Sequence, residues 1–166
     1  GGSAKSMRQN YMIQLAEVLD CLGNTTLSCS VLENDKITKE FLSKFLHDVH
    51  EVNDKLDKPK SENDFMLLRY PMDKLTKLET CILYYWEASV CFRYGKEQKK
   101  AAGSMKKILR VIQNYLRVVM KEEEHDKAIE AKVMIGEFLN EIKNRIVKQS
   151  LLCLFSHYNY INMVEI

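Results

Sequence analysis

CILYYWEASVCF, the stretch from Cys81 to Phe92, is apolar or aromatic at every position except Glu87 and Ser89. If this stretch is helical, nearly the whole circumference of the helix is apolar. Such a helix is stable in water only when other parts of the protein surround it. We therefore expect a helix over about residues 72–94 to be the central element of the fold.

The rest of the chain is also typical of helices. Its 166 residues include only two prolines, Pro59 and Pro71, and six glycines, so little interrupts the backbone hydrogen bonds of a helix. A chain of this length buries a real core as one domain. We expect an all-α fold, a single compact helical bundle of five to seven helices over residues 4–166. Residues 1–3 are typical of a remnant of an expression tag.

Apolar spacing and turn residues place the other elements. We expect helices at about 5–22, 37–56 and 96–119 and one ending near 149, a helical turn at 65–70, a mobile loop at 57–64 and a last segment at 150–166. The apolar residues at helical spacing are Met7, Tyr11, Leu15, Val18 and Leu22 in the first helix and Ile37, Phe41, Phe45 and Val49 in the second. Gly23 is expected to cap the first helix, and Pro71 to lie in the first turn of the central helix.

Positive charge is concentrated in the helix that follows the central one. The segment from Arg93 to Arg117 has eight basic residues and a single glutamate, a net charge of +7, whereas the whole chain carries +2 and the remainder therefore −5. Helical spacing puts these cations on one side of the helix and an apolar stripe on the other. The candidate partner-binding residues are Lys96, Lys99, Lys100, Lys106, Lys107, Arg110 and Arg117.

This basic stripe has three interpretations. It is an ordinary solvated helix face, a docking surface for an acidic or phosphorylated protein segment, or a contact for the phosphates of RNA, DNA or lipid headgroups. Nucleic-acid readers usually place aromatic side chains among the charges, and the stripe has none. The pI of about 8.2 is also below that of most such domains. Of the two functional interpretations, we favour the acidic protein partner.

A second candidate interface lies near the end of the chain. Residues 150–166 carry Glu165 as their only formal charge. They either form the last helix of the core or present an apolar surface to a second copy or to another chain. The candidate interface residues are Leu151, Phe155 and Tyr158.

No pattern in the sequence points to catalysis, a metal or a cofactor. Donors that can hold a divalent ion are gathered at His47, Asp48, His50, Glu51 and Asp54. Their spacing differs from His-Glu-x-x-His, and a charged helix surface facing solvent is the better interpretation. Cys153 and His157, four residues apart, would share one face of a helix, but nothing in the sequence suggests a lowered pKa of the thiol, and a core cysteine is the better interpretation. Glu87, if it is buried, should meet an arginine, a lysine or a tyrosine.

The cysteines bear on the compartment. They are Cys21, Cys29, Cys81, Cys91 and Cys153, an odd number without CxxC spacing. Several fall at expected core positions, where free thiols behave as small apolar groups, and this suits a reducing compartment. We therefore expect an intracellular protein, nuclear or cytoplasmic. The sequon Asn24-Thr25-Thr26 argues weakly for secretion.

Together these observations predict a non-enzymatic protein–protein interaction domain, a scaffold or adaptor element of a larger intracellular protein. No membrane span is expected, since the longest uncharged apolar run is shorter than the roughly 20 residues that a spanning helix needs. One alternative is a secreted helical cytokine-like ligand with most cysteines in disulfides. Another is a domain that binds phosphate backbones or lipid headgroups, and a homo-oligomer is also open.

Overall fold

The computed structural model describes residues 2–33, 35–53 and 65–121 and, further along the chain, residues 133, 136, 137, 140, 141, 143 and 144. Its elements are the helices α1 (Gly2–Glu33), α2 (Lys39–Asn53), α3 (Lys77–Tyr94) and α4 (Gln98–Lys121) and the 3-10 turns η2 (Met66–Arg69) and η3 (Met72–Lys74). No strand occurs in this described part, so the expected all-α class is confirmed. The count of five to seven helices and the loop at 57–64 depend on residues outside it.

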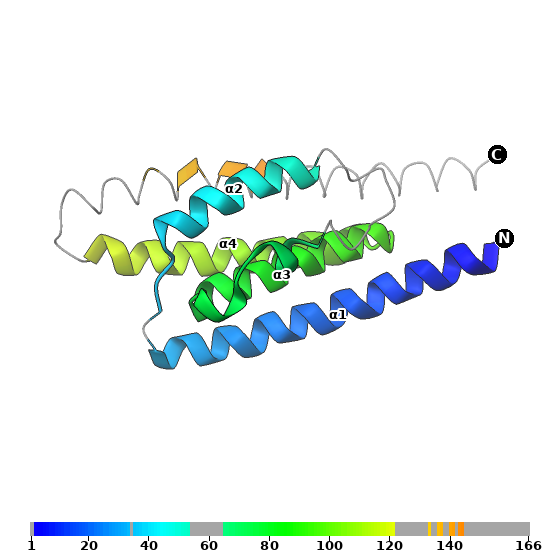
Figure 1. The fold of residues 1–166 in the computed structure, drawn as a ribbon, viewed down its shortest axis with the longest axis horizontal. Coiled ribbons are helices and arrows are strands. Elements are labelled where there is room, and N and C mark those ends of the chain that lie inside the picture. The colour runs from blue at the N-terminus through cyan, green and yellow to red at the C-terminus, as the bar shows by residue number, and fades with distance from the viewer. Residues whose placement is uncertain are drawn as a thin grey trace.

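Helix α3 is the central element, as its sequence predicts. It packs against α1 on one side and α4 on the other (Figure 1). Every residue from Tyr85 to Phe92 is buried. The apolar circumference of this helix is therefore covered on all sides by the other elements.

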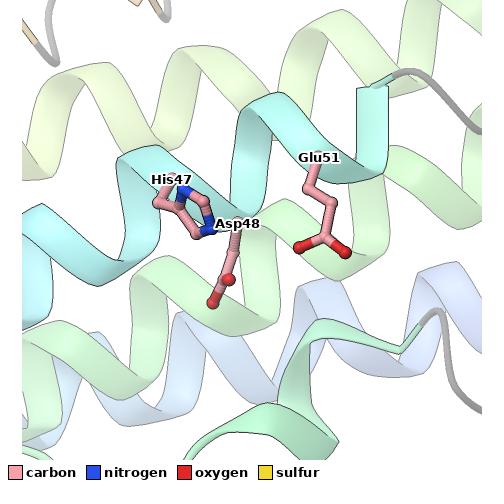
Figure 2. Close-up of side chains that lie close together, drawn as sticks. All are labelled: His47, Asp48 and Glu51. Carbon is pink, nitrogen blue, oxygen red and sulfur yellow. The ribbon is translucent and has the colours of Figure 1, made fainter.

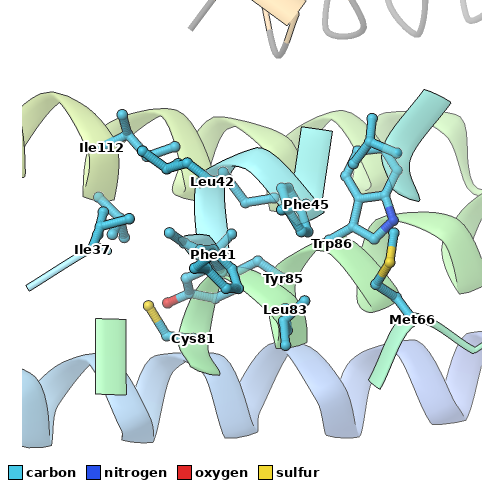
Figure 3. Close-up of a cluster of buried hydrophobic side chains, with 14 of the residues drawn as sticks. Ile37, Phe41, Leu42, Phe45, Met66, Cys81, Leu83, Tyr85, Trp86 and Ile112 are labelled. Carbon is cyan, nitrogen blue, oxygen red and sulfur yellow. The ribbon is translucent and has the colours of Figure 1, made fainter. Parts of the chain in front are cut away.

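The core beside α3 is built from large side chains of α2. Phe41, Phe45 and Val49 are buried together with Ile37, which precedes the helix, and this confirms the face expected from their spacing. The Phe45 ring meets the edge of Trp86 at a centroid distance of 5.7 Å (Figure 3). Such an edge-to-face pair stabilises the fold by about 0.5–1.5 kcal/mol beyond the burial of its area.

The start of α3 differs from the expected start at residue 72. Pro71 precedes the short turn η3, and α3 begins only after Thr76, whose hydroxyl accepts a hydrogen bond from the Glu79 amide at 3.2 Å. The Glu79 carboxylate accepts in return from the Thr76 amide at 2.9 Å, which completes a capping box. Glu79 also accepts from the Thr38 amide and hydroxyl at 2.8 and 2.6 Å. One buried carboxylate thus fixes the start of α3 to the connection between α1 and α2.

Helix α1 does not end at Gly23, so the expected C-terminal cap is wrong. The helix continues for ten further residues to Glu33, and Gly23 is buried within it. A Cβ atom at this position would lie 2.6 Å from Cε1 of Tyr85. The glycine is needed because the Tyr85 ring of α3 lies directly against the α1 backbone.

The buried face of α1 also differs from the apolar spacing noted in the sequence. Ala16 and Leu19 are buried against α3, whereas Met7, Tyr11 and Val18 are 71%, 61% and 57% exposed. Helix α1 carries apolar residues on two sides, and only one of them packs on the core. Its other side, with Met7, Tyr11 and Val18, is exposed.

The turn between α3 and α4 is tight. Gly95 follows the last residue of α3, Lys96 adopts a left-handed backbone with φ of 63°, and α4 begins at Gln98 rather than at Lys96. A Cβ atom at Gly95 would lie 2.5 Å from Cγ1 of Ile13. The glycine therefore allows α1 to approach the turn closely.

Candidate functional site

The cations of α4 fall into two groups around the helix. At about 100° per residue, Lys99, Lys106, Arg110 and Arg117 lie within an arc of about 40°. We name these four residues the α4 cation row. Lys100 and Lys107 lie about 80–100° away from the row on the side of the helix that faces α1.

Lys100 and Lys107 are bound by carboxylates of α1. The Lys100 ammonium lies 3.2 Å from Oε1 of Glu17, and the Lys107 ammonium lies 2.5 Å from Oδ2 of Asp20. The second pair is the better shielded, since its side chains are 33% and 20% exposed, against 50% and 54% for the first. These two lysines attach α4 to α1 and have a role within the fold.

In the part of the chain that the structure describes, no carboxylate pairs with the α4 cation row in this way. All four of its side chains are exposed, and none forms an ion pair with any residue in the described ranges. From Lys99 to Arg117 the row runs for about 27 Å, at a rise of about 1.5 Å per residue. On the opposite side of α4, Met105, Ile108 and Ile112 are fully buried in the core, as the apolar stripe predicts. Lys96 is exposed but lies in the turn before α4, outside the row.

A polar junction connects α1, α3 and α4 beside the row. Asn24 Oδ1 accepts hydrogen bonds from the Tyr85 hydroxyl at 2.8 Å and from the Lys107 ammonium at 3.2 Å. The Ser104 hydroxyl donates to Asp20 at 3.0 Å. Burial is the main cause that raises the pKa of Tyr85 above its usual value, so the phenol stays a hydrogen-bond donor. The junction orients α4 about its own axis.

His47, Asp48 and Glu51 form the one group of metal-ligand type found among the described residues (Figure 2). Their donor atoms lie within 4.8 Å of one another. The Arg69 guanidinium already lies 3.0 Å from Glu51 Oε2 and 3.6 Å from Asp48 Oδ1. The protein's own cation thus meets both carboxylates, and a metal ion would have to displace it.

The expectation that this charged surface faces solvent is only partly right. His47 and Glu51 are exposed, but Asp48 is buried and accepts a hydrogen bond from the Tyr70 hydroxyl at 2.8 Å. Burial first, and then this hydrogen bond, raise the pKa of Tyr70 well above its usual value. Asp48 and Glu51 therefore hold the segment around η2 onto α2. The His50 side chain and Asp54 lie outside the described residues.

Glu87 is buried, as expected if α3 is central, but one of its partners is of an unexpected kind. Its Oε2 accepts a hydrogen bond from the backbone amide of Met66 at 2.9 Å. The sequence predicts an arginine, lysine or tyrosine partner for a buried glutamate, and nothing in it indicates the backbone amide of η2. The sequence reasoning also missed Glu79, although Thr76-x-x-Glu79 is the pattern of a capping box and signals its local role.

The described cysteines divide by burial. Cys81 and Cys91 are buried, and Cys21 and Cys29 are exposed on α1. Burial, followed by the charge of Asp35, raises the pKa of the Cys81 thiol to about 12, which makes it a poor nucleophile at neutral pH.

The second candidate interface, Leu151, Phe155 and Tyr158, and the pair Cys153 and His157 lie outside the described residues. None of the described helices has the length and apolar character needed to cross a bilayer. Comparison with family models, with curated proteins and with solved structures finds no match to this chain.

Proposed function

We propose that this protein is a non-enzymatic interaction domain whose α4 cation row binds an acidic or phosphorylated segment of a protein partner. The observation that carries the proposal is the division of the basic stripe. Lys100 and Lys107 are paired within the fold, whereas four cations in one line on the same helix are exposed to solvent. The proposed site is therefore narrower than the sequence suggests, because it leaves out these two lysines and Lys96.

The row weakens the helix that carries it. Lys106 and Arg110 are one turn apart, and like charges at this spacing destabilise a helix by about 0.2–0.5 kcal/mol. Within the described ranges, no carboxylate pairs with the row to offset this repulsion. A ligand with negative charge would remove this repulsion, and this supports binding over a merely solvated face.

The local surroundings favour a protein partner over phosphate ligands. Among the described residues of α4, those beside the row include Gly103, Gln113 and Asn114, and none of them offers an aromatic ring to stack on a base. A helix that binds at a membrane surface inserts its apolar face into the lipid. The apolar face of α4 is already buried in the core, so α4 has only charge to offer a headgroup.

The secreted alternative is less well supported. Glycosylation acceptors lie in surface loops, whereas Asn24 lies inside the continuous helix α1 and its side-chain oxygen accepts two hydrogen bonds. We propose that the protein works inside the cell, in the nucleus or cytoplasm, with its cysteines reduced. A thiol count under denaturing conditions tests this: five free thiols support it, and fewer than two favour the secreted ligand.

The proposed function is tested by charge reversal with a matched control. The row variant combines Lys99→Glu, Lys106→Glu and Arg110→Glu. The control combines three reversals elsewhere on the surface and has the same net charge: Arg8→Glu, Lys36→Glu and Lys74→Glu, all at exposed positions.

Binding is measured by fluorescence anisotropy with a labelled glutamate-rich peptide and with a labelled phosphoserine peptide. At low salt the row variant should lose at least about tenfold in affinity, or 1.4 kcal/mol. The control should stay close to the wild type, and circular dichroism should show both variants folded. Equal losses in the two variants would mean that only net charge matters, and the row would then not be the site. A single-stranded oligonucleotide that binds more tightly than either peptide, with a steep loss on adding salt, would instead support the phosphate-backbone alternative.

A further inference from the structure

The spacing of the α4 cation row restricts the shape of its partner. The four cations follow one another at intervals of seven, four and seven residues. Along the helix axis these intervals are about 10.5, 6 and 10.5 Å. The order of spacings is the same read from either end, so the row has no direction.

An extended acidic segment fits this spacing poorly. A strand rises about 3.3 Å per residue, and its side chains alternate between two faces. The cations would then face positions about three, five and eight residues along the strand, which are not all on one side. Only about half of the carboxylates would point at the row.

A helix fits the spacing without adjustment. Carboxylates at positions i, i+7, i+11 and i+18 of a partner helix lie within about 40° of one another and have the same rise as the row. Because the spacing is symmetric, parallel and antiparallel partners fit equally well.

Gly103 is a second and independent observation at the same surface. It lies in the interior of α4, about 40° from Lys99 and between Lys99 and Lys106. A glycine there destabilises the helix by comparison with alanine. Gly23 and Gly95 are required by close contacts with Tyr85 and Ile13, but a Cβ atom at Gly103 would meet nothing within 4 Å in the described part of the chain.

An absent side chain in the middle of a helix–helix contact lets the two backbones approach each other. We propose that the partner segment is an α-helix with an acidic stripe, which lies along α4 with its backbone closest to Gly103. This inference rests on the proposed function, because it names the shape of the acidic partner that the row binds.

The experiment uses the full chain and two labelled helical peptides of identical composition, rich in alanine and glutamine. The in-line peptide has glutamates at i, i+7, i+11 and i+18, and the scattered peptide has them at i, i+5, i+10 and i+15, which distributes them around the helix. The in-line peptide should bind about tenfold more tightly at low salt. Gly103→Leu should weaken the in-line peptide by a similar factor and leave the scattered peptide unchanged, while Gln14→Leu, at an exposed position of α1, should affect neither.

Three outcomes would overturn the inference in distinguishable ways. If both peptides bind equally and both lose affinity in the row variant, the row binds acidic segments of any shape, and only the helical partner is wrong. If Gly103→Leu leaves the in-line peptide unaffected, the close approach at Gly103 is wrong. If the row variant changes neither peptide, the proposed function fails together with the inference. Because Gly103→Leu introduces a better helix former at an open position, loss of binding through unfolding is checked by its melting temperature.

Discussion

Gly23 and Gly103 should respond in opposite directions to the same substitution, although both lie inside α-helices. Gly103→Ala adds a methyl group where no atom of the described residues lies within 4 Å. Alanine should therefore stabilise the protein by about 0.5–1 kcal/mol through helix propensity. In a chain of this length, that difference raises the melting temperature by about 1–4 °C.

Gly23→Ala has the same gain in propensity but places its methyl group 2.6 Å from Cε1 of Tyr85 and 2.7 Å from Cδ1. The ring must move, which costs about 1–3 kcal/mol in a packed core. Its hydroxyl also donates to Asn24 at 2.8 Å, and loss of that bond costs about 0.5–1.5 kcal/mol. The balance is a net destabilisation of about 1–3 kcal/mol.

Urea denaturation followed by circular dichroism measures both differences from the midpoints, provided that the slopes agree. A double variant with Tyr85→Leu isolates the contact, since Gly23→Ala should become much less harmful once the ring is gone. If Gly23→Ala stabilises the protein as much as Gly103→Ala does, the close packing of α1 on Tyr85 is wrong.

Three further outcomes follow from the contacts of single side chains. Glu79→Gln should destabilise the fold by about 1–3 kcal/mol, as measured by urea denaturation. The buried carboxylate accepts three hydrogen bonds, which link the α1–α2 connection to the start of α3, and hydrogen bonds to charged groups are stronger than those to neutral ones. Lys107→Met should lower the free energy of unfolding by up to about 1 kcal/mol, since its partly exposed ion pair is lost. Lys106→Met should instead raise it slightly, by about 0.2–0.5 kcal/mol, because the repulsion from Arg110 is relieved; a loss as large as that of Lys107→Met would contradict the division of the stripe. With a thiol reagent at pH 8, Cys21 should react in the native protein and Cys81, whose pKa is raised to about 12, only after unfolding, as mass spectrometry of the labelled peptides would show.

The sequence predicts the centre of the fold better than its periphery. The stretch around Trp86 is apolar on all sides, and no arrangement other than enclosure satisfies it, so its role is readable without coordinates. Helix α1 is different because it has apolar residues on two faces, and periodicity alone does not say which face meets α3. A glycine at the end of an apolar pattern predicts a helix cap, as at Gly23. The actual requirement for this glycine is its contact with the ring of Tyr85, which lies far along the chain and is not visible from local sequence.

The candidate site shows the same limit. The spacing of residues in α4 correctly predicts that the cations lie opposite the buried side of the helix, because the positions of the cations and of the apolar residues follow from the same helical periodicity. The division between the paired lysines, Lys100 and Lys107, and the row depends on Glu17 and Asp20 of α1. The sequence does not predict which lysines these carboxylates meet, because the register of α1 against α4 is set by tertiary packing. The capping role of Glu79 is local and readable, but its bonds to Thr38 depend on how the chain turns after α1.

The contacts that hold α4 would make its outer side a rigid surface for the proposed partner. Its inner side is fixed by buried residues such as Met105 and Ile112, and a second side, about 80–100° from the row, is fixed by Lys107 and its partners on α1. Contacts on two sides restrict rotation and sliding of the helix, so the row keeps its orientation relative to the fold. A partner that meets such a surface loses little free energy to reorganisation of the site, and charge along the row speeds its approach at low salt. Lys107→Met should therefore weaken binding of the in-line peptide slightly by loosening α4, through slower association and faster dissociation, although Lys107 lies outside the proposed binding surface.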